Sequence, residues 1–164
     1  MNQLQHRVPN VAPAGITTIA SDLLLAAHTN VSVLITGASR DQRSRCARFI
    51  HVSSNSGSPF VNLWIPRLGK DRTDGLPLSQ RFDSARGGTL FIDDIAHLTR
   101  DGQAALFRLL EDRAAQTSTL AAYRPGVRVI TGANRHLDAE RRTGAFSDRL
   151  FCRLNIIHLD LFVR

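Results

Sequence analysis

Positions 87–94 of the chain read GGTLFIDD, and this stretch decides the fold class. Two glycines interrupt regular structure, an apolar run follows, and two consecutive aspartates end it. A short apolar run without polar alternation is typical of a strand that is buried on both faces of a parallel sheet. Because ligands bind beyond the carboxyl ends of such strands, Asp93 and Asp94 are candidate functional residues.

The rest of the chain alternates between apolar runs and helical periodicity. Apolar runs predict four further strands, at residues 31–35, 60–65, 127–131 and 155–162. Helical spacing predicts helices at residues 16–28, 43–52, 99–113, 137–142 and 146–154, with a polar loop at residues 67–80. The second helix is expected to turn Cys46, Ala47, Phe49 and Ile50 inward. The alternation predicts an α/β fold in three layers, a five-stranded parallel sheet with helices on both faces.

The composition fits one globular domain. The chain has 164 residues, 43% of them hydrophobic and 21% charged. We expect a loose leader at residues 1–13 and a core at residues 14–164. No apolar stretch of about 18 residues and no secretory signal is present, so we expect a cytoplasmic protein without membrane contact. Cys46 and Cys152 cannot form a disulfide framework and are expected to be buried.

The charge is strongly positive and is carried almost entirely by arginine. Lys and Arg number 21 against 14 Asp and Glu, giving +7, and Lys70 is the single lysine. A positive chain can bind nucleic acid. The wide scatter of the arginines instead favours a compositional preference, and the densest group spans residues 40–48. Phe49, the one aromatic residue beside this group, is predicted to face the core, which counts against a single-strand binding surface.

Polar residues follow three of the predicted strands. Gly37 begins a polar loop after the first strand, Asp93 and Asp94 end the third, and Asn134 and Arg135 follow the fourth. The carboxyl ends of parallel strands meet at one edge of a sheet, so these residues are expected to converge. In this order they suggest a nucleotide site of the P-loop type.

Five ordered segments resemble the AAA+ core of sigma-54-dependent transcription activators, the bacterial enhancer-binding proteins. Residues 33–39 look like the Walker A segment, 82–95 like Walker B, and 127–137 like the sensor I strand. Residues 103–111 and 146–157 are similar to the helix after Walker B and to the arginine-finger segment. The resemblance implies a P-loop NTPase fold that binds ATP and Mg²⁺.

The resemblance also implies roles for individual residues. Asp93 matches the Mg²⁺ ligand, Asp94 stands at the catalytic glutamate, Asn134 matches the sensor, and Arg153 matches the second arginine finger, while the first falls on Ser147. The phosphate-binding loop comprises Gly37, Ala38, Ser39, Arg40, Asp41, Gln42, Arg43 and Ser44.

The departures from the family pattern predict a degenerate site. Arg40 and Gln42 replace glycines that turn backbone amides toward phosphates, and Arg43 replaces the phosphate-binding lysine. Side chains held in the left-handed region at those positions would cost about 1–2 kcal/mol each. Asp94 is one methylene shorter than glutamate, and general-base geometry tolerates such errors poorly. We therefore expect weak binding of ATP and Mg²⁺ with little or no hydrolysis.

Two pieces of the family pattern are missing from the sequence. The loop motif G-A-F-T-G-A that contacts sigma-54 does not occur between Trp64 and Phe82, and the chain ends before the helical lid. We expect a regulatory or interaction subunit that associates with itself or with another AAA+ activator, without sigma-54 contact or direct DNA binding. Two alternatives stay open: a working ATPase with Arg43 in the lysine role and Arg153 as finger, and an arginine-rich nucleic-acid-binding module.

Overall fold

The computed structural model describes residues 14–55, 57–67, 77–117 and 126–162. The leader expected at residues 1–13 lies outside this range. Among the described residues, no helix combines the length and the apolar character that crossing a membrane requires. The elements run in the order α1 Ala14–Ala27, β1 Val33–Thr36, α2 Arg40–Asn55, β2 Phe60–Trp64, α3 Leu78–Ser84, β3 Thr89–Asp93, the 3₁₀ turn η1 Ile95–His97, α4 Arg100–Thr117, β4 Arg128–Ala133, α5 Asp138–Arg142, α6 Asp148–Leu154 and β5 Ile157–Asp160.

The five strands form one parallel sheet in the order β2-β3-β4-β1-β5. The all-parallel sheet predicted from the sequence is confirmed. β1 lies between β4 and β5, with Thr36 opposite both Ala133 and Asp160. The carboxyl ends of β1, β3 and β4 therefore lie side by side, as the strand-end motifs predict.

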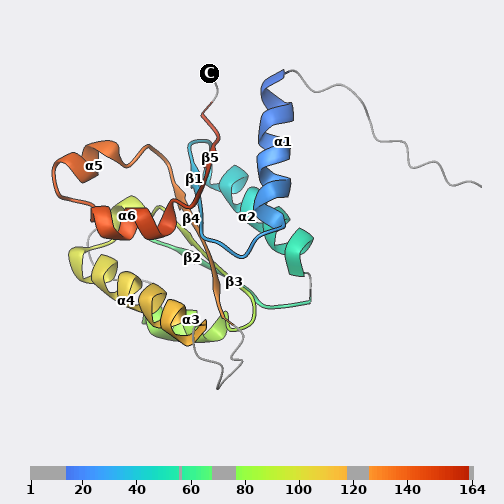
Figure 1. The fold of residues 1–164 in the computed structure, drawn as a ribbon. Helices are drawn as coiled ribbons and strands as arrows, with labels where there is room; N and C mark the ends of the chain where they lie inside the picture. Colours follow the sequence, from blue (N-terminus) through green and yellow to red (C-terminus); the bar gives the residue numbers. More distant parts are fainter. Residues whose placement is uncertain (1–13, 56, 68–76, 118–125, 163–164) are drawn as a thin grey trace, which may run out of the picture.

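Two hydrophobic cores lie on the two faces of the sheet. Alternate residues of β1 divide between them: Val33 and Ile35 pack with α1 and α2, and Leu34 packs with α4 and α6. This follows from the two-residue period of a strand, which sends neighbouring side chains to opposite faces. Figure 1 shows α1 and α2 covering one face, with α3, α4 and α6 over the other. The three-layer architecture is confirmed.

The helix that follows β1 differs from its prediction in two ways. It begins at Arg40 and runs to Asn55, starting three residues earlier than the predicted 43–52. Ala47 and Ile50 are buried as expected, but Phe49 is 44% exposed, so its predicted inward position is wrong. Phe49 comes two residues after Ala47, about 200° round the helix, so it points away from the face that Ala47 and Ile50 bury.

Two other predictions need correction. The polar stretch predicted as a loop at residues 67–80 contains the start of α3, because Leu78 and Phe82 pack against the core at helical spacing. Cys152 is exposed rather than buried, since Leu150 and Leu154 form the inward face of α6.

The predicted N-cap at Thr99 is confirmed, because its Oγ1 accepts a hydrogen bond from the Gly102 amide at 3.1 Å.

Candidate functional site

The predicted phosphate-binding loop is short, and its polar groups hydrogen-bond to one another. Only Gly37, Ala38 and Ser39 separate β1 from α2. The Ser39 amide donates to Gln42 Oε1 at 3.0 Å, and the Gln42 amide donates to Ser39 Oγ at 3.3 Å. This reciprocal pair is a capping box, which satisfies free amides at a helix start. Amides at the position where a P-loop would bind phosphate therefore have partners within the chain.

Backbone strain in the loop falls on a different residue from the ones predicted. Ala38 has a φ of 55°, whereas Arg40 and Gln42 lie in α2 with ordinary negative φ. The predicted left-handed strain at Arg40 and Gln42 is therefore wrong. With side chains in place of glycines, these positions take the right-handed helical region and α2 starts early. The short turn then depends on Gly37, at φ 82°, and on Ala38.

Arg43 is almost completely buried and points back into the loop. Its side chain is 2% exposed, and Nε donates to Asp93 Oδ1 at 2.7 Å. Nη2 donates to Asp93 Oδ2 and to Asp94 Oδ1, each at 3.0 Å. Nη1 donates to the carbonyls of Gly37 at 3.2 Å and Ala38 at 2.9 Å. All three guanidinium nitrogens therefore donate hydrogen bonds within the protein, and the two loop carbonyls accept from a cation.

The two carboxylates of the Walker B position both lie in this network. Asp93 is 1% exposed at the end of β3, directly against Gly132 of β4. A Cβ on Gly132 would lie 2.1 Å from Asp93 Oδ1, so only glycine permits the approach. Asp94, at φ 59°, has its Oδ1 on Arg43 and its Oδ2 on Trp64. As arranged, these residues fit a guanidinium rather than Mg²⁺, and no metal-binding cluster occurs among the described residues.

Trp64 belongs to the site, and sequence reasoning missed it. It ends β2 in register with Asp93 and is 41% exposed. Its Nε1 donates to Asp94 Oδ2 at 2.9 Å, and the guanidinium of Arg40 lies 4.5 Å from the centre of its ring. The available signal was its place as the last residue of an apolar run, at the same sheet edge as the aspartates.

The opposite side of the loop is covered by the segment after β5. A Cβ on Gly37 would lie 2.7 Å from the backbone nitrogen of Phe162. The Phe162 ring lies 4.6 Å from the ring of His136, and His158 Nε2 forms a 2.8 Å hydrogen bond with Thr36 Oγ1. Burial lowers the pKa of His158, and the nearby His136 lowers it further while Asp160 opposes this.

The other predicted site residues are not drawn into the network. Asn134 directly follows β4 at the same sheet edge but is exposed, and it hydrogen-bonds to no described residue. Ser44 is half-buried on α2, and Asp41 is exposed on the same helix. Arg153 pairs at 2.6 Å with Glu111 of α4, with both side chains about half exposed. The structure therefore groups Gly37, Ala38, Arg43, Asp93 and Asp94.

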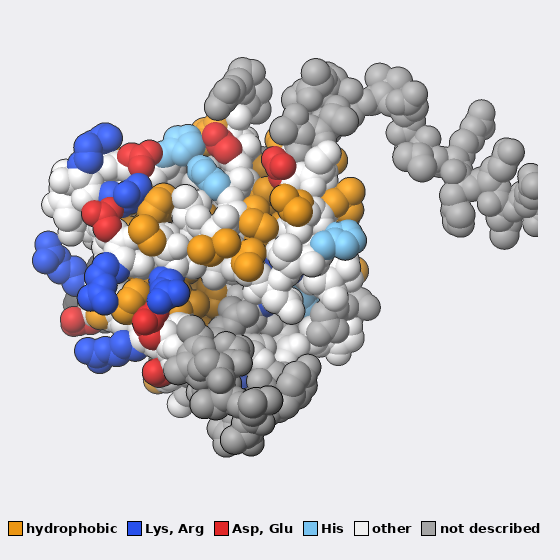
Figure 2. All heavy atoms as spheres, viewed as in Figure 1, with side chains coloured by type: hydrophobic (Ala, Val, Ile, Leu, Met, Phe, Trp, Pro, Cys, Tyr) orange, Lys and Arg blue, Asp and Glu red, His pale blue; other side chains and the backbone are white. Residues whose placement is uncertain are grey.

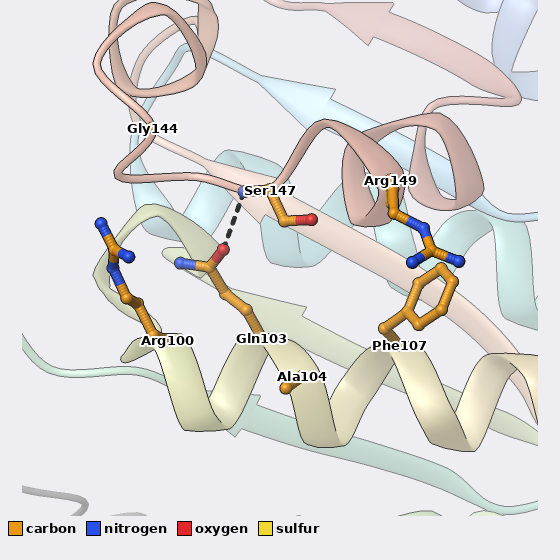
Figure 3. A pocket seen from close by; sticks show the side chains of 7 residues that line it. All are labelled: Arg100, Gln103, Ala104, Phe107, Gly144, Ser147 and Arg149. Carbon is orange, nitrogen blue, oxygen red and sulfur yellow. Dashed lines mark hydrogen bonds between the residues drawn. The ribbon is translucent and has the colours of Figure 1, made fainter.

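The arginine-finger segment lines a separate hollow of about 280 Å³ between α4 and the start of α6. Figure 3 shows Arg100 and Arg149 on either side, with the hydrogen bond from the Ser147 amide to Gln103 Oε1 between them. Ser147 is the N-cap of α6, because its Oγ accepts from the Leu150 amide. Arg149 lies 5.0 Å from the centre of the Phe107 ring. The sequence predicts that the loop contacting sigma-54 is missing between Trp64 and Phe82. The middle of that stretch, residues 68–76, lies outside the described part of the chain.

Comparison with known proteins places this geometry in a family. Residues 78–160 match the family described as the sigma-54 interaction domain. The chain is 32% identical over 152 residues to the DNA-binding transcriptional regulator NtrC of Salmonella typhimurium, with 82% of this chain and 32% of that protein covered. It is also 32% identical over 159 residues to the regulatory protein AtoC of Escherichia coli, covering 87% of this chain and 34% of that protein. The chain thus spans about a third of the length of these curated relatives.

Solved structures share the fold. NtrX from Brucella abortus in complex with ADP superimposes with a TM-score of 0.75 at 23% identity, covering 94% of this chain and 37% of that one. The P-loop NTPase domain of a sigma-54 activator from E. coli gives a TM-score of 0.66 at 22% identity, with 92% and 96% covered. At these identities the likeness establishes the P-loop NTPase fold.

Proposed function

The chain belongs to the sigma-54 interaction domain family of AAA+ proteins, and from this premise we propose that it is a regulatory or interaction subunit whose nucleotide site is filled by its own Arg43. ATP with Mg²⁺ binds weakly and is hydrolysed little or not at all. The domain keeps the sheet of the family and presents its surface to a second copy or to another AAA+ activator.

The observation that carries the proposal is the ion-pair network of Arg43 with Asp93 and Asp94. The guanidinium and Asp93 are each 2% exposed or less, so the contacts are removed from water. Separating one partner of a buried pair typically costs about 3–5 kcal/mol. Mg²⁺–ATP would have to displace Arg43 from Asp93 before binding. Each 1.4 kcal/mol of that cost lowers the apparent affinity about tenfold.

Two further contacts support the loss of hydrolysis. Both oxygens of Asp94 accept hydrogen bonds, from Arg43 and from Trp64, so neither is directed at a water molecule. The backbone amides of Ser39 and Gln42 each donate to the other residue's side chain, so neither is available to donate to a phosphate. The rate of the chemical step depends strongly on preorganised donors, since removing one typically lowers kcat about 10²–10³-fold.

The working-ATPase alternative assigns Arg43 to the phosphates. The same guanidinium cannot contact a phosphate and hold Asp93 through Nε and Nη2 at once. That alternative also uses Arg153 as finger, and this side chain is paired with Glu111. Both contacts favour the filled site over the working ATPase.

The regulatory role rests on the relatives. The curated proteins NtrC and AtoC are named as regulators, and NtrX has been crystallised with ADP and with ATP. Those statements concern the relatives, which are about three times longer than the matched region. Self-association is the simplest interaction consistent with the family, and sedimentation of the purified chain over a concentration series measures it.

Isothermal titration with Mg²⁺–ATP tests the filled site. We compare the native chain with a variant carrying Arg40→Gly, Gln42→Gly and Arg43→Lys, which restores the family loop. The native chain is expected to show no saturable heat at micromolar concentrations, and the restored variant is expected to bind. A variant with Arg142→Lys, an exposed arginine of α5, is the matched control. Micromolar binding and turnover by the native chain would contradict the proposal and favour the working ATPase.

A further inference from the structure

Helix α2 and the edge strand β2 bring two arginine–aromatic stacks together on one surface. The guanidinium of Arg40 lies 4.5 Å from the centre of the Trp64 ring, and that of Arg48 lies 4.7 Å from the centre of the Phe60 ring. Eight helical residues rise about 12 Å and four strand residues about 13 Å, so the spacings of the two pairs match. The stacks therefore repeat along the line where α2 lies beside β2.

This surface is open to solvent, aromatic and positive. Trp64, at the end of β2, is 41% exposed, and Phe60, at the start of that strand, is half-buried. Arg45 lies between the two stacked arginines in sequence and is exposed as well. Asp41 is the one acidic residue of α2. We define the α2–β2 surface as the residues Arg40, Arg45, Arg48, Phe60 and Trp64.

Arg40 and Arg48 lack the carboxylate partners that several other described arginines have. Around α4, α5 and α6, blue and red side chains alternate in Figure 2, and arginines there pair with carboxylates. Examples are Arg141 with Asp148 and Arg153 with Glu111. No described carboxylate lies within ion-pair distance of Arg40 or Arg48, which stack on rings instead. Their charges stay available to an outside anion.

We propose that the α2–β2 surface binds single-stranded nucleic acid. A guanidinium that lies over a ring can present its outer face to a base and its N–H edges to a phosphate. Aromatic platforms interleaved with cations are the arrangement that binds single strands without sequence preference, because every base has a π-face. These platforms could not be found in the arginine-rich stretch of the sequence itself, because Phe60 and Trp64 come from another element.

A single strand suits this surface better than an acidic peptide or a duplex. An acidic peptide would pair with the arginines but would leave the ring-stacked guanidinium planes without a flat partner. A duplex keeps its bases stacked on each other, so it can use only the charges. Arg48 and Phe60 make no contact with Arg43 or Asp93, whereas Trp64 at the other end of the surface donates to Asp94.

Trp64 is the single tryptophan of the chain, so its fluorescence reports directly on this surface. We titrate the full chain with a thymidine oligonucleotide of about 12 nucleotides, a length in the range of single-strand binding sites. Fluorescence anisotropy of the labelled oligonucleotide measures affinity, and quenching of Trp64 measures stacking. A duplex of equal length and a polyglutamate peptide are the comparison ligands. We expect tight binding of the single strand alone, with a log–log salt slope near −2 from about three phosphate contacts.

Arg48→Lys keeps the charge and removes the stacked plane. We expect it to weaken single-strand binding about fivefold or more, the equivalent of about 1 kcal/mol of stacking, without changing the salt slope. Arg142→Lys is expected to change neither quantity. The proposal is overturned by no binding at about 100 μM in low salt, the weak end of non-specific affinity. The proposal is also overturned if Arg48→Lys and Arg142→Lys change the single-strand affinity equally. Binding of polyglutamate that is stronger than binding of the single strand would overturn it too, and would indicate an acidic protein partner.

Discussion

Replacing Arg43 with alanine tests whether the buried network holds the domain together. The substitution leaves Asp93, which is 1% exposed, without its cation, and frees the carbonyls of Gly37 and Ala38. Breaking a buried pair in this way typically costs about 3–5 kcal/mol. For a domain of this size, each kcal/mol lowers the melting temperature by about 2–4 °C, so a fall of roughly 6–20 °C is expected.

Urea unfolding followed by Trp64 fluorescence is the assay, because Trp64 donates to Asp94 inside the same network. Circular dichroism on the same samples checks that both signals change together, as two-state unfolding requires. Arg142→Ala, at an exposed position, is the matched control and should change stability by less than about 0.5 kcal/mol. A loss below about 1 kcal/mol for Arg43→Ala, the range of exposed ion pairs, would refute the reasoning.

Two more outcomes follow from the same structure. Gly132→Ala should lower the urea midpoint by an amount equivalent to about 1–3 kcal/mol or more, because its Cβ would lie 2.1 Å from Asp93 Oδ1; an unchanged midpoint would mean that Asp93 does not occupy this place. Burial lowers the pKa of His51 from 6.5, as do the charges of Arg48 and Arg128, while a hydrogen bond to the backbone of Ser58 opposes them. The unfolded chain then binds more protons than the native one just below pH 6.5, so the free energy of unfolding should fall as the pH drops from about 7 to 5. His51→Asn should flatten that dependence in thermal melts, and an equally steep variant would argue against His51 as the cause.

The sequence determined the layers of the fold because each element has its own period. Continuous apolar runs such as the one ending at Asp93 can be buried only in a sheet covered on both faces, and all five strands occur where such runs lie. The alternation of Val33, Leu34 and Ile35 between two cores follows from strand geometry alone. The convergence of the loop after β1 with Asp93 at one edge likewise follows from parallel strands.

Local pattern failed where several residues compete for the same position. Phe49 is apolar and was expected in the core, yet Ala47 and Ile50 fill the inward face of α2 and leave it exposed. Leu78 and Phe82 begin a helix inside an apparently polar stretch because the core under α4 accepts them. Neither outcome depends on the residue itself; each depends on the volume that remains once its neighbours are packed.

Only the tertiary structure decided what Arg43 does. From the sequence it is a cation in the place of a lysine, facing a phosphate or solvent. In the fold, Asp93 and Asp94 at the end of β3 and the carbonyls of Gly37 and Ala38 after β1 accept its hydrogen bonds and neutralise its buried charge. The pairing of Arg40 with Trp64 and of Arg48 with Phe60 is likewise a contact between elements. A side chain's partner depends on which strands lie side by side, and the order β2-β3-β4-β1-β5 brings together residues that are far apart in the chain.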